Sequence, residues 1–206
     1  MSDNEFSYTP QSGTEEVNYN IQCVFGNLNV TSRNAKFAIT VVPKSGSVLY
    51  SGTEQSITGF EAIKYGNKTF PVQNGKLEFE VNGQKFTISA LEAAASGTNA
   101  GTYPVSVTGD YIVKDARGKI VTSEFKVDSE QVNLKIRKRT LTFTSATDSK
   151  PYDGTPLTNS EVTVGGDGFA DGESVTFSVT GSIVYPGEED NTFTWDWGAT
   201  DPDNYN

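Results

Sequence analysis

The chain contains no histidine and only one cysteine, Cys23, among its 206 residues. Without histidine it lacks the commonest general base and a frequent zinc ligand. One cysteine cannot form a disulfide framework within the chain. A carboxylate pair can still hydrolyse a glycosidic bond, but the acidic residues here cluster in Gly-rich turns. We therefore expect a protein that is not an enzyme and has no cofactor, and we interpret Cys23 as a small buried strand residue.

Positive charge and long apolar runs are also scarce. Lysine and arginine number 16 against 26 acidic residues, so the net charge is -10. This balance disfavours nucleic acid and anionic membranes as partners, whereas a basic ligand or a cation remains compatible with it. No run of 18 apolar residues occurs, so we expect no membrane insertion of this segment.

What the sequence has in abundance is strand-forming residues. Thr, Val, Ile, Phe and Tyr alternate with polar residues, and Gly, Asn, Asp and Pro interrupt them, a pattern typical of an all-β chain. Asn82-Gly83 between two alternating runs is the strongest hairpin signal. Residues 90–95 are the only candidate for a helical turn, and we expect one turn or a strand edge there. The predicted strands include 37–42, 60–65, 69–72, 76–81, 84–89, 103–107, 110–114, 124–127, 140–144, 175–179, 191–197 and one near Val162.

A repeated turn organises the chain. The turn at Tyr152-Asp153-Gly154 has an echo at Tyr50-Ser51-Gly52, about a hundred residues earlier. In each copy the glycine can adopt the positive φ that other residues resist. The repetition favours a structural role for both turns, in which each tyrosine anchors its turn over a core. Ligand contact by the two tyrosines is the alternative.

Further repeats divide the chain into modules. Residues 27–30 resemble residues 133–136, and each copy is followed by a basic residue, Arg33 or Arg139, and a new strand. The same order of landmarks therefore occurs twice. The predicted parts are 1–33, the tail strands of a preceding module; 34–137, a longer β-sandwich module with an inserted hairpin; and 138–206, a second β-sandwich module that lacks its final strand.

The final strand of the last module has a counterpart at the other end of the chain. Residues 4–20 parallel residues 191–206, so residues 21–30 represent the strand that should follow. We expect a sheet edge of the last module to be open. The edge is either tolerated or filled by the N-terminal segment of a neighbouring molecule, by strand addition.

The stretch 150–158, followed by 164–173, resembles the Tyr-Asp-Gly repeat modules (YDG/MBG-like) of large bacterial surface proteins. Residues 99–103 resemble a related phrase of such repeats. The likeness is good over 138–206 and looser over 34–137, where Ser51 replaces the aspartate. The resemblance implies tandem immunoglobulin-like β-sandwich modules that are exported and held at the bacterial cell surface, outside the cell, as adhesin-like stalks. It brings no catalytic residue.

Two aromatic residues are candidates for ligand contact. Phe193, Trp195 and Trp197 recur at every second position, so they share one face of a strand. The corresponding Phe6 and Tyr8 are also nonpolar, which favours a core face. A sugar-stacking platform formed by Trp195 and Trp197 is the alternative.

The last module also carries a set of acidic residues that raises the question of calcium. None of them follows the Asp-x-Asp-x-Asp-Gly loop pattern with a distal glutamate, so we interpret them as solvated turn carboxylates and keep calcium as the alternative. The set consists of Asp167, Asp171, Glu173, Glu188, Glu189, Asp190, Asp201 and Asp203.

The function that these patterns favour is a non-enzymatic structural stalk, an adhesin-like segment of an exported bacterial surface protein. Its partners are then the neighbouring modules of the same chain. The alternative is direct binding of a host glycan or host protein by the inserted residues, 60–100, of the longer module.

Overall fold

The computed structural model describes residues 35–206 and the separate positions 9, 11–13, 22, 24 and 26. Contacts divide the chain into Met1–Lys36 and Phe37–Asn206, a division that falls near the predicted boundary after residue 33. The tail strands predicted for 1–33, the strand position of Cys23 and the residues Phe6 and Tyr8 lie outside the described residues. The predicted boundary between 137 and 138 stays a prediction, because Phe37–Asn206 forms one unit.

The described part of the chain is all-β, as the alternation predicted. Its helical turns are two short 3-10 helices, η2 (Thr122–Glu124) and η3 (Pro202–Asn204). Within the described residues no helix combines the length and the apolar character that crossing a membrane requires. We call residues 37–137 the first segment and residues 138–206 the second segment.

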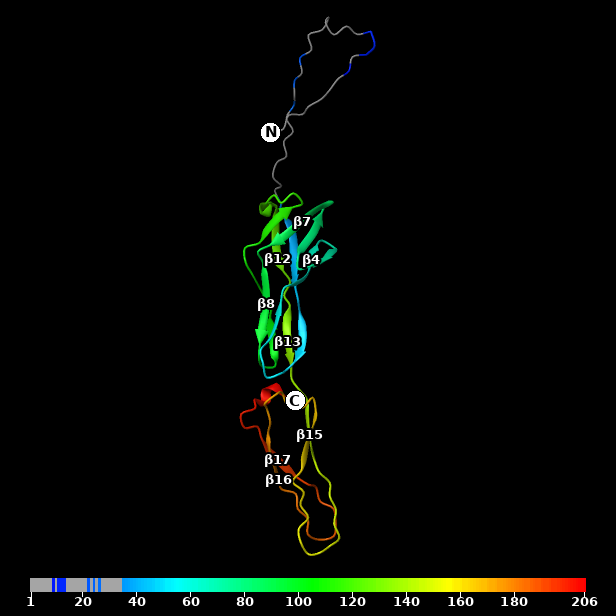
Figure 1. Cartoon of the computed structure of the whole chain (residues 1–206), viewed down its shortest axis with the longest axis vertical. Coiled ribbons are helices and arrows are strands. Elements are labelled where there is room, and N and C mark those ends of the chain that lie inside the picture. Colours follow the sequence, from blue (N-terminus) through cyan, green and yellow to red (C-terminus); the bar gives the residue numbers. More distant parts are fainter. Residues whose placement is uncertain (1–8, 10, 14–21, 23, 25, 27–34) are drawn as a thin grey trace. The chain divides into compact units, whose positions relative to one another are not determined.

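The strands of the first segment form four small sheets (Figure 1). In sheet order these are β12 (Phe125–Ser129), β1 (Phe37–Pro43), β4 (Phe60–Tyr65) and β5 (Lys68–Pro71); β10 (Ser106–Thr108), β8 (Glu92–Gly97) and β3 (Gln55–Thr58); β11 (Ile112–Asp115), β7 (Gln84–Ser89) and β6 (Leu77–Val81); and β2 (Gly46–Leu49), β13 (Asn133–Arg137) and β9 (Gly101–Pro104). The second segment has two sheets of two strands each: β14 (Leu141–Ser145) with β15 (Val162–Gly166), and β16 (Thr176–Val179) with β17 (Phe193–Asp196).

The first and last strands of the first segment run parallel to each other. Phe37 lies opposite Phe125 where β1 meets β12, and Leu49 lies opposite Arg137 where β2 meets β13. The separation is 88 residues at both places (125 − 37 and 137 − 49). The register is therefore the same at both ends of this pairing. Sequence periodicity gave no sign of it, because it reports which face a residue occupies and not its partner strand.

The predicted hairpin at Asn82-Gly83 is confirmed. Val81 of β6 lies opposite Gln84 of β7, and Asn82 and Gly83 have φ values of 51° and 79°, which is the geometry of a type I′ turn. Residues 90–95 form no helical turn. Most of them belong to β8, which pairs with β3 on one edge and β10 on the other.

One predicted strand is interrupted. The run 103–107 is divided between β9 and β10 at Val105. The N–H of Val105 donates to the carbonyl of Val132 at 2.9 Å, so the chain leaves the sheet of β13 and continues in the sheet of β8. The alternation of side chains continues through such a change of partner, which is why the sequence read as one strand.

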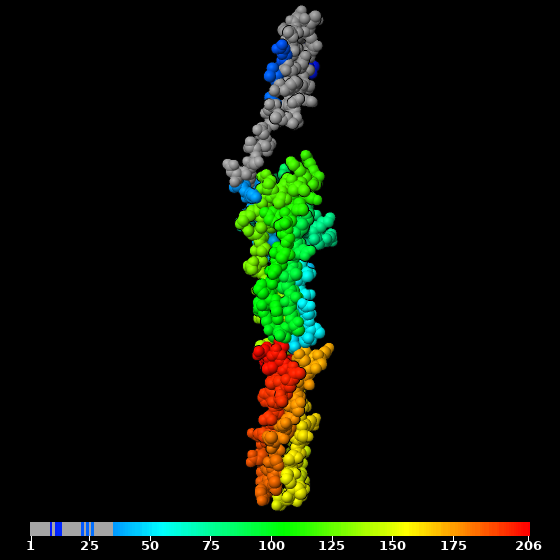
Figure 2. Space-filling model, turned by 90° about the vertical axis from the view of Figure 1, so that its left-hand side faces the viewer, coloured from blue at the N-terminus to red at the C-terminus, as the bar shows by residue number. Residues whose placement is uncertain are grey.

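Two clusters of buried apolar residues lie in the described unit. The first belongs to the first segment and includes Ile39, Ile63, Phe79, Val113 and Phe125. The second joins Tyr50, Leu134 and Ile136 of the first segment to Ala170 and Tyr205 of the second. The two segments therefore share a core at their contact, where Figure 2 shows the red C-terminal residues against the green and cyan ones.

Candidate functional site

The turn at Tyr50 lies at the contact between the two segments. The N–H of Tyr50 donates to the carbonyl of Arg137 at 2.9 Å, which continues the pairing of β2 with β13 past the strand end. Gly52 then turns the chain with a φ of 75°. The Tyr50 side chain is 3% exposed, and its hydroxyl donates to Glu173 Oε1 at 2.5 Å. For Tyr50, the expected anchor over a core is what the structure shows.

Glu173 receives a second phenol from the end of the second segment. The hydroxyl of Tyr205 donates to the other carboxylate oxygen of Glu173 and accepts the N–H of Ala170 at 3.0 Å. The Tyr50 and Tyr205 rings meet edge to face, with centroids 5.8 Å apart. One carboxylate thus fixes two tyrosines from different segments, and two hydrogen bonds to a charged acceptor are each stronger than neutral ones.

Arg139 connects the same elements through the backbone. Its guanidinium donates to three carbonyls: Nη1 to Tyr50 at 3.0 Å, Nε to Gly168 at 2.8 Å and Nη2 to Asp167 at 2.5 Å. Because a guanidinium presents its donors in a rigid plane, it holds these three carbonyls in one arrangement. The sequence marked Arg139 only as the basic residue after a junction and gave it no partner.

Asn204 adds a further connection between the two segments. Its side chain is almost fully buried, with 1% exposed. The side-chain carbonyl accepts the N–H of Ala100 at 2.7 Å, and the side-chain amide donates to Asn99 Oδ1 at 3.4 Å. Asn99 and Ala100 belong to the loop before β9, so this loop of the first segment is fastened to the end of η3.

The burial of the two tyrosines changes their acidity. Burial, and then the hydrogen bond to Glu173, raises the pKa of Tyr50 well above the usual tyrosine value. Burial raises the pKa of Tyr205 to about 12; the Glu173 carboxylate adds to this effect and the Ala170 N–H opposes it. Both phenols therefore stay neutral donors at physiological pH, as a shared anionic acceptor requires.

The second copy of the turn lies in a different environment, and here the prediction is wrong. The Tyr152 side chain is 61% exposed and stacks only on Tyr185, with ring centroids 6.5 Å apart. Tyr50 is covered because Ala170, Glu173 and Tyr205 of the following segment pack on it. No described segment takes that place beside Tyr152, so the residue does not anchor its turn over a core.

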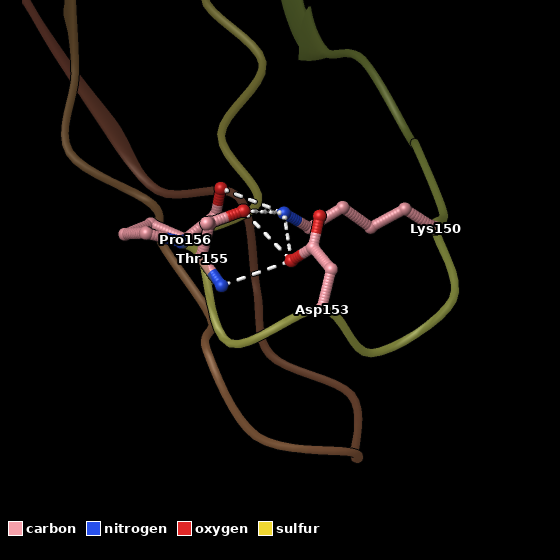
Figure 3. Close-up of polar contacts among 4 residues, drawn as sticks. All are labelled: Lys150, Asp153, Thr155 and Pro156. Carbon is pink, nitrogen blue, oxygen red and sulfur yellow. Dashed lines mark hydrogen bonds and ion pairs between the residues drawn. The ribbon is translucent and has the colours of Figure 1, made fainter.

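The Tyr152 turn is ordered instead by its polar side chains (Figure 3). Asp153 Oδ1 accepts the N–H of Thr155 at 2.9 Å and its hydroxyl at 2.7 Å. Lys150 Nζ donates to the same oxygen at 2.9 Å and to the Pro156 carbonyl at 3.2 Å. The Thr155 hydroxyl and then Lys150 lower the pKa of Asp153 below the usual aspartate value. Gly154 has a φ of 77°, close to that of Gly52.

The three aromatic residues of β17 and the turn after it, which their spacing predicted to share a core face, each contact other aromatic rings. Phe193 and Trp195 contact the rings of Phe177 and Phe143 respectively, whereas Trp197 packs against Tyr205 at the contact between segments. Trp195 is nevertheless 48% exposed. The two tryptophans considered as a sugar platform therefore pack against different aromatic neighbours.

Acidic residues of the second segment accept hydrogen bonds within the fold. Among the residues that the structure places, no three Asp, Glu or Cys side chains converge as cation ligands would. Glu173 was interpreted as a solvated carboxylate, but it accepts both tyrosines. Asp167 likewise accepts the N–H of Thr140 at 2.8 Å, so two members of the acidic set hold the fold together.

What this arrangement can do is hold two folded segments together. Its hydrogen bonds lie between side chains and backbone groups of the protein itself. A scan of family models and searches of curated proteins and of solved structures found no match to the chain.

Proposed function

We propose that the chain is a non-enzymatic spacer, an adhesin-like segment of an exported bacterial surface protein built from tandem immunoglobulin-like β-sandwich modules. Such a spacer carries tension between a cell and whatever lies beyond it. It must therefore resist pulling within each module and keep successive modules joined.

The parallel pairing of the first and last strands is the observation that carries this proposal. Force that enters at Phe37 and leaves at Arg137 pulls β1–β2 and β12–β13 in opposite directions along their length. The pairing keeps one register from Phe37 opposite Phe125 to Leu49 opposite Arg137. The inter-strand hydrogen bonds are therefore loaded together in shear and not broken one after another.

The contact between the segments supports the same proposal. Arg139 lies two residues after β13 and donates to the carbonyl of Tyr50, so the force leaving the first segment enters a cross-linked region. Tyr50, Glu173 and Tyr205 then connect the turn after β2 to the middle and the C-terminal end of the second segment. A flexible linker would instead leave the segments free to bend at each junction.

Single-molecule pulling tests the proposal by comparing the unfolding forces for two pairs of attachment points. Handles attached to cysteines at the exposed positions Lys36 and Lys138, in a Cys23→Ser background, load the terminal strands in shear. Handles at Lys36 and the exposed Asn67 pull β1 and β4 apart from neighbouring ends, because these strands are antiparallel. We expect a clearly higher unfolding force for the first pair. Equal forces would remove the mechanical basis of the proposal.

The alternative function, direct binding of a host glycan or host protein, has one observation in its favour. A groove of about 510 Å³ is lined mostly by the inserted region, including Phe60 and Leu91, and also by Lys44 outside it. Binding of the full chain to glycan arrays or host matrix proteins, lost in Lys44→Glu and kept in the exposed Lys68→Glu control, would support it. Absence of binding in the unmodified chain favours the spacer.

A further inference from the structure

The sequence contains two Asn-Gly pairs, Asn74-Gly75 and Asn82-Gly83, and the structure places both in exposed hairpin turns. Asn74 and Gly75 have φ values of 51° and 71°, and Gln73 forms an antiparallel bridge with Lys76 across them. These angles are close to the 51° and 79° of Asn82 and Gly83. Both turns therefore have the geometry of type I′.

An asparagine followed by glycine carries two groups that can react with each other. The backbone nitrogen of the glycine attacks Cγ of the asparagine side chain, and the new C–N bond closes a succinimide ring. The bond from Cγ to Nδ2 breaks, and the nitrogen leaves as ammonia with the proton that the glycine N–H gives up through solvent. Water then opens the ring at either carbonyl, which produces aspartate or iso-aspartate. Glycine hinders the attack least because it has no Cβ.

A closed type I′ turn prevents this attack. The first central residue of such a turn has a ψ of about 30°, and this rotation directs the nitrogen of the next residue away from the asparagine side chain. Asn74 and Asn82 must therefore leave the turn conformation before a ring can close. How often each turn opens then determines the rate of the reaction there.

The turn at Asn82 is held by a continuous ladder. Strands β6 and β7 pair from Val81 opposite Gln84 to Leu77 opposite Ile88, and β11 pairs with the other edge of β7. Val81, Leu77 and Ile88 are buried in the apolar cluster of the first segment. Opening of this turn therefore disturbs pairs whose side chains belong to that cluster.

The turn at Asn74 is closed by much less. The N–H of Lys76 donates to the carbonyl of Gln73 at 3.0 Å, and the bridge between these two residues is isolated from any ladder. The chain before the turn leaves for β4, where the N–H of Val72 donates to the carbonyl of Glu61 at 2.8 Å. The chain after it enters β6 and pairs with β7. All residues of this turn are exposed, so it can open without exposing the apolar cluster.

We infer that Asn74 is a site of spontaneous deamidation in the folded protein and that Asn82 is protected by its ladder. Conversion places a carboxylate beside Gly75, which lines the same groove as Lys44. Iso-aspartate also lengthens the backbone of the turn by a carbon atom. The reaction needs no partner other than water, so the inference does not depend on the spacer function.

Incubation of the full chain in mildly alkaline buffer, followed by tryptic peptide mapping with mass spectrometry, tests the inference. Cleavage after each lysine places Asn74 in the peptide 69–76 and Asn82 in the peptide 77–85. We expect conversion of Asn74 to be at least about tenfold faster than that of Asn82, because the two turns differ in opening free energy. In a parallel sample unfolded in urea neither turn exists, and the two rates should become similar.

A variant of the bridge supplies the second measurement. Lys76→Pro removes the N–H that closes the Asn74 turn, so it should raise the rate at Asn74 and leave the rate at Asn82 unchanged. Fragment ions locate each conversion in this variant, which has no cleavage site at position 76. No increase at Asn74 would contradict the role of the bridge.

Three results for the unmodified chain would overturn the inference. Equal rates in the folded chain, or faster conversion of Asn82, would show that the ladder gives no protection. A difference that persists unchanged in urea would assign it to the neighbouring residues and not to the fold. A folded chain in which Asn74 stays intact while the unfolded chain converts would show that this turn does not open.

Discussion

The phenol oxygen of Tyr50 lies 2.5 Å from a carboxylate oxygen of Glu173, a residue 123 positions later in the chain. The same carboxylate accepts Tyr205. Three side chains from distant parts of the sequence thus meet where the two segments join, and they explain why one copy of the repeated turn is buried while the other is exposed.

Replacing each repeated tyrosine tests this difference directly. Tyr50→Ala removes a buried ring and leaves Glu173 without one of its donors, so we expect a loss of about 3–5 kcal/mol in the free energy of unfolding. Tyr152→Ala removes an exposed ring, and we expect a change within about 0.5 kcal/mol. Denaturant unfolding of both variants measures the effect. Equal losses would show that the two turns have the same role.

High pH should open the contact between the segments. The pKa of Tyr205 is raised to about 12 and that of Tyr50 is raised further, so folding favours the neutral phenols. Their contribution is complete below the unfolded tyrosine pKa of about 10 and is lost as pH rises through the folded values. Absorbance titration at high pH should show late ionisation of Tyr50 and of Tyr205, and each should disappear in its own Tyr→Phe variant. Late ionisation that is unchanged in both variants would contradict the assignment.

Asp153 should titrate below the usual range for aspartate, because its charged form accepts bonds from Thr155 and Lys150. Thr155→Val removes the hydroxyl donor, the largest single cause, and Lys150→Met removes the ammonium donor together with its charge. NMR titration of the Asp153 carboxyl should therefore show a higher pKa in both variants. An unchanged midpoint in Thr155→Val would mean that the turn is not held by this bond.

Arg139 and Arg137 form a second matched pair. Arg139→Lys keeps the charge but loses the planar set of donors to three carbonyls, so we expect a loss of about 1–3 kcal/mol in the free energy of unfolding. Arg137 is exposed, and Arg137→Lys should change that free energy by less than about 0.5 kcal/mol. Thermal unfolding of both variants gives the comparison, and a neutral Arg139→Lys would assign the contact to the tyrosines alone.

Local features of the fold followed from the sequence, and long-range pairing did not. The hairpin at Asn82-Gly83 was predictable because its turn geometry is encoded in two adjacent residues. The parallel partners of β1 and β2 were not, since antiparallel and parallel neighbours leave the same alternation in a strand. Tyr50 and Tyr152 looked alike for a similar reason. Their difference comes from Glu173 and Tyr205, which no local pattern connects to Tyr50.

Trp195 and Trp197 were grouped by period two, which was correct for the face they share. Their neighbours differ, because Trp195 contacts Phe143 whereas Trp197 contacts Phe169 and Tyr205. These neighbours come from distant parts of the sequence, and spacing along one strand does not report them.

The central claim is that the contact at Tyr50 and Arg139 joins the two segments into one continuous element. Pulsed electron–electron double resonance measures the distance between spin labels placed at the exposed positions Glu61 and Thr194. The labelled protein carries Cys23→Ser and is diluted with unlabelled protein. We predict a single narrow distance distribution that broadens when Tyr50→Ala and Arg139→Gln are combined. A broad distance distribution in the protein without these two substitutions would contradict the account. So would a narrow distribution that the two substitutions leave unchanged.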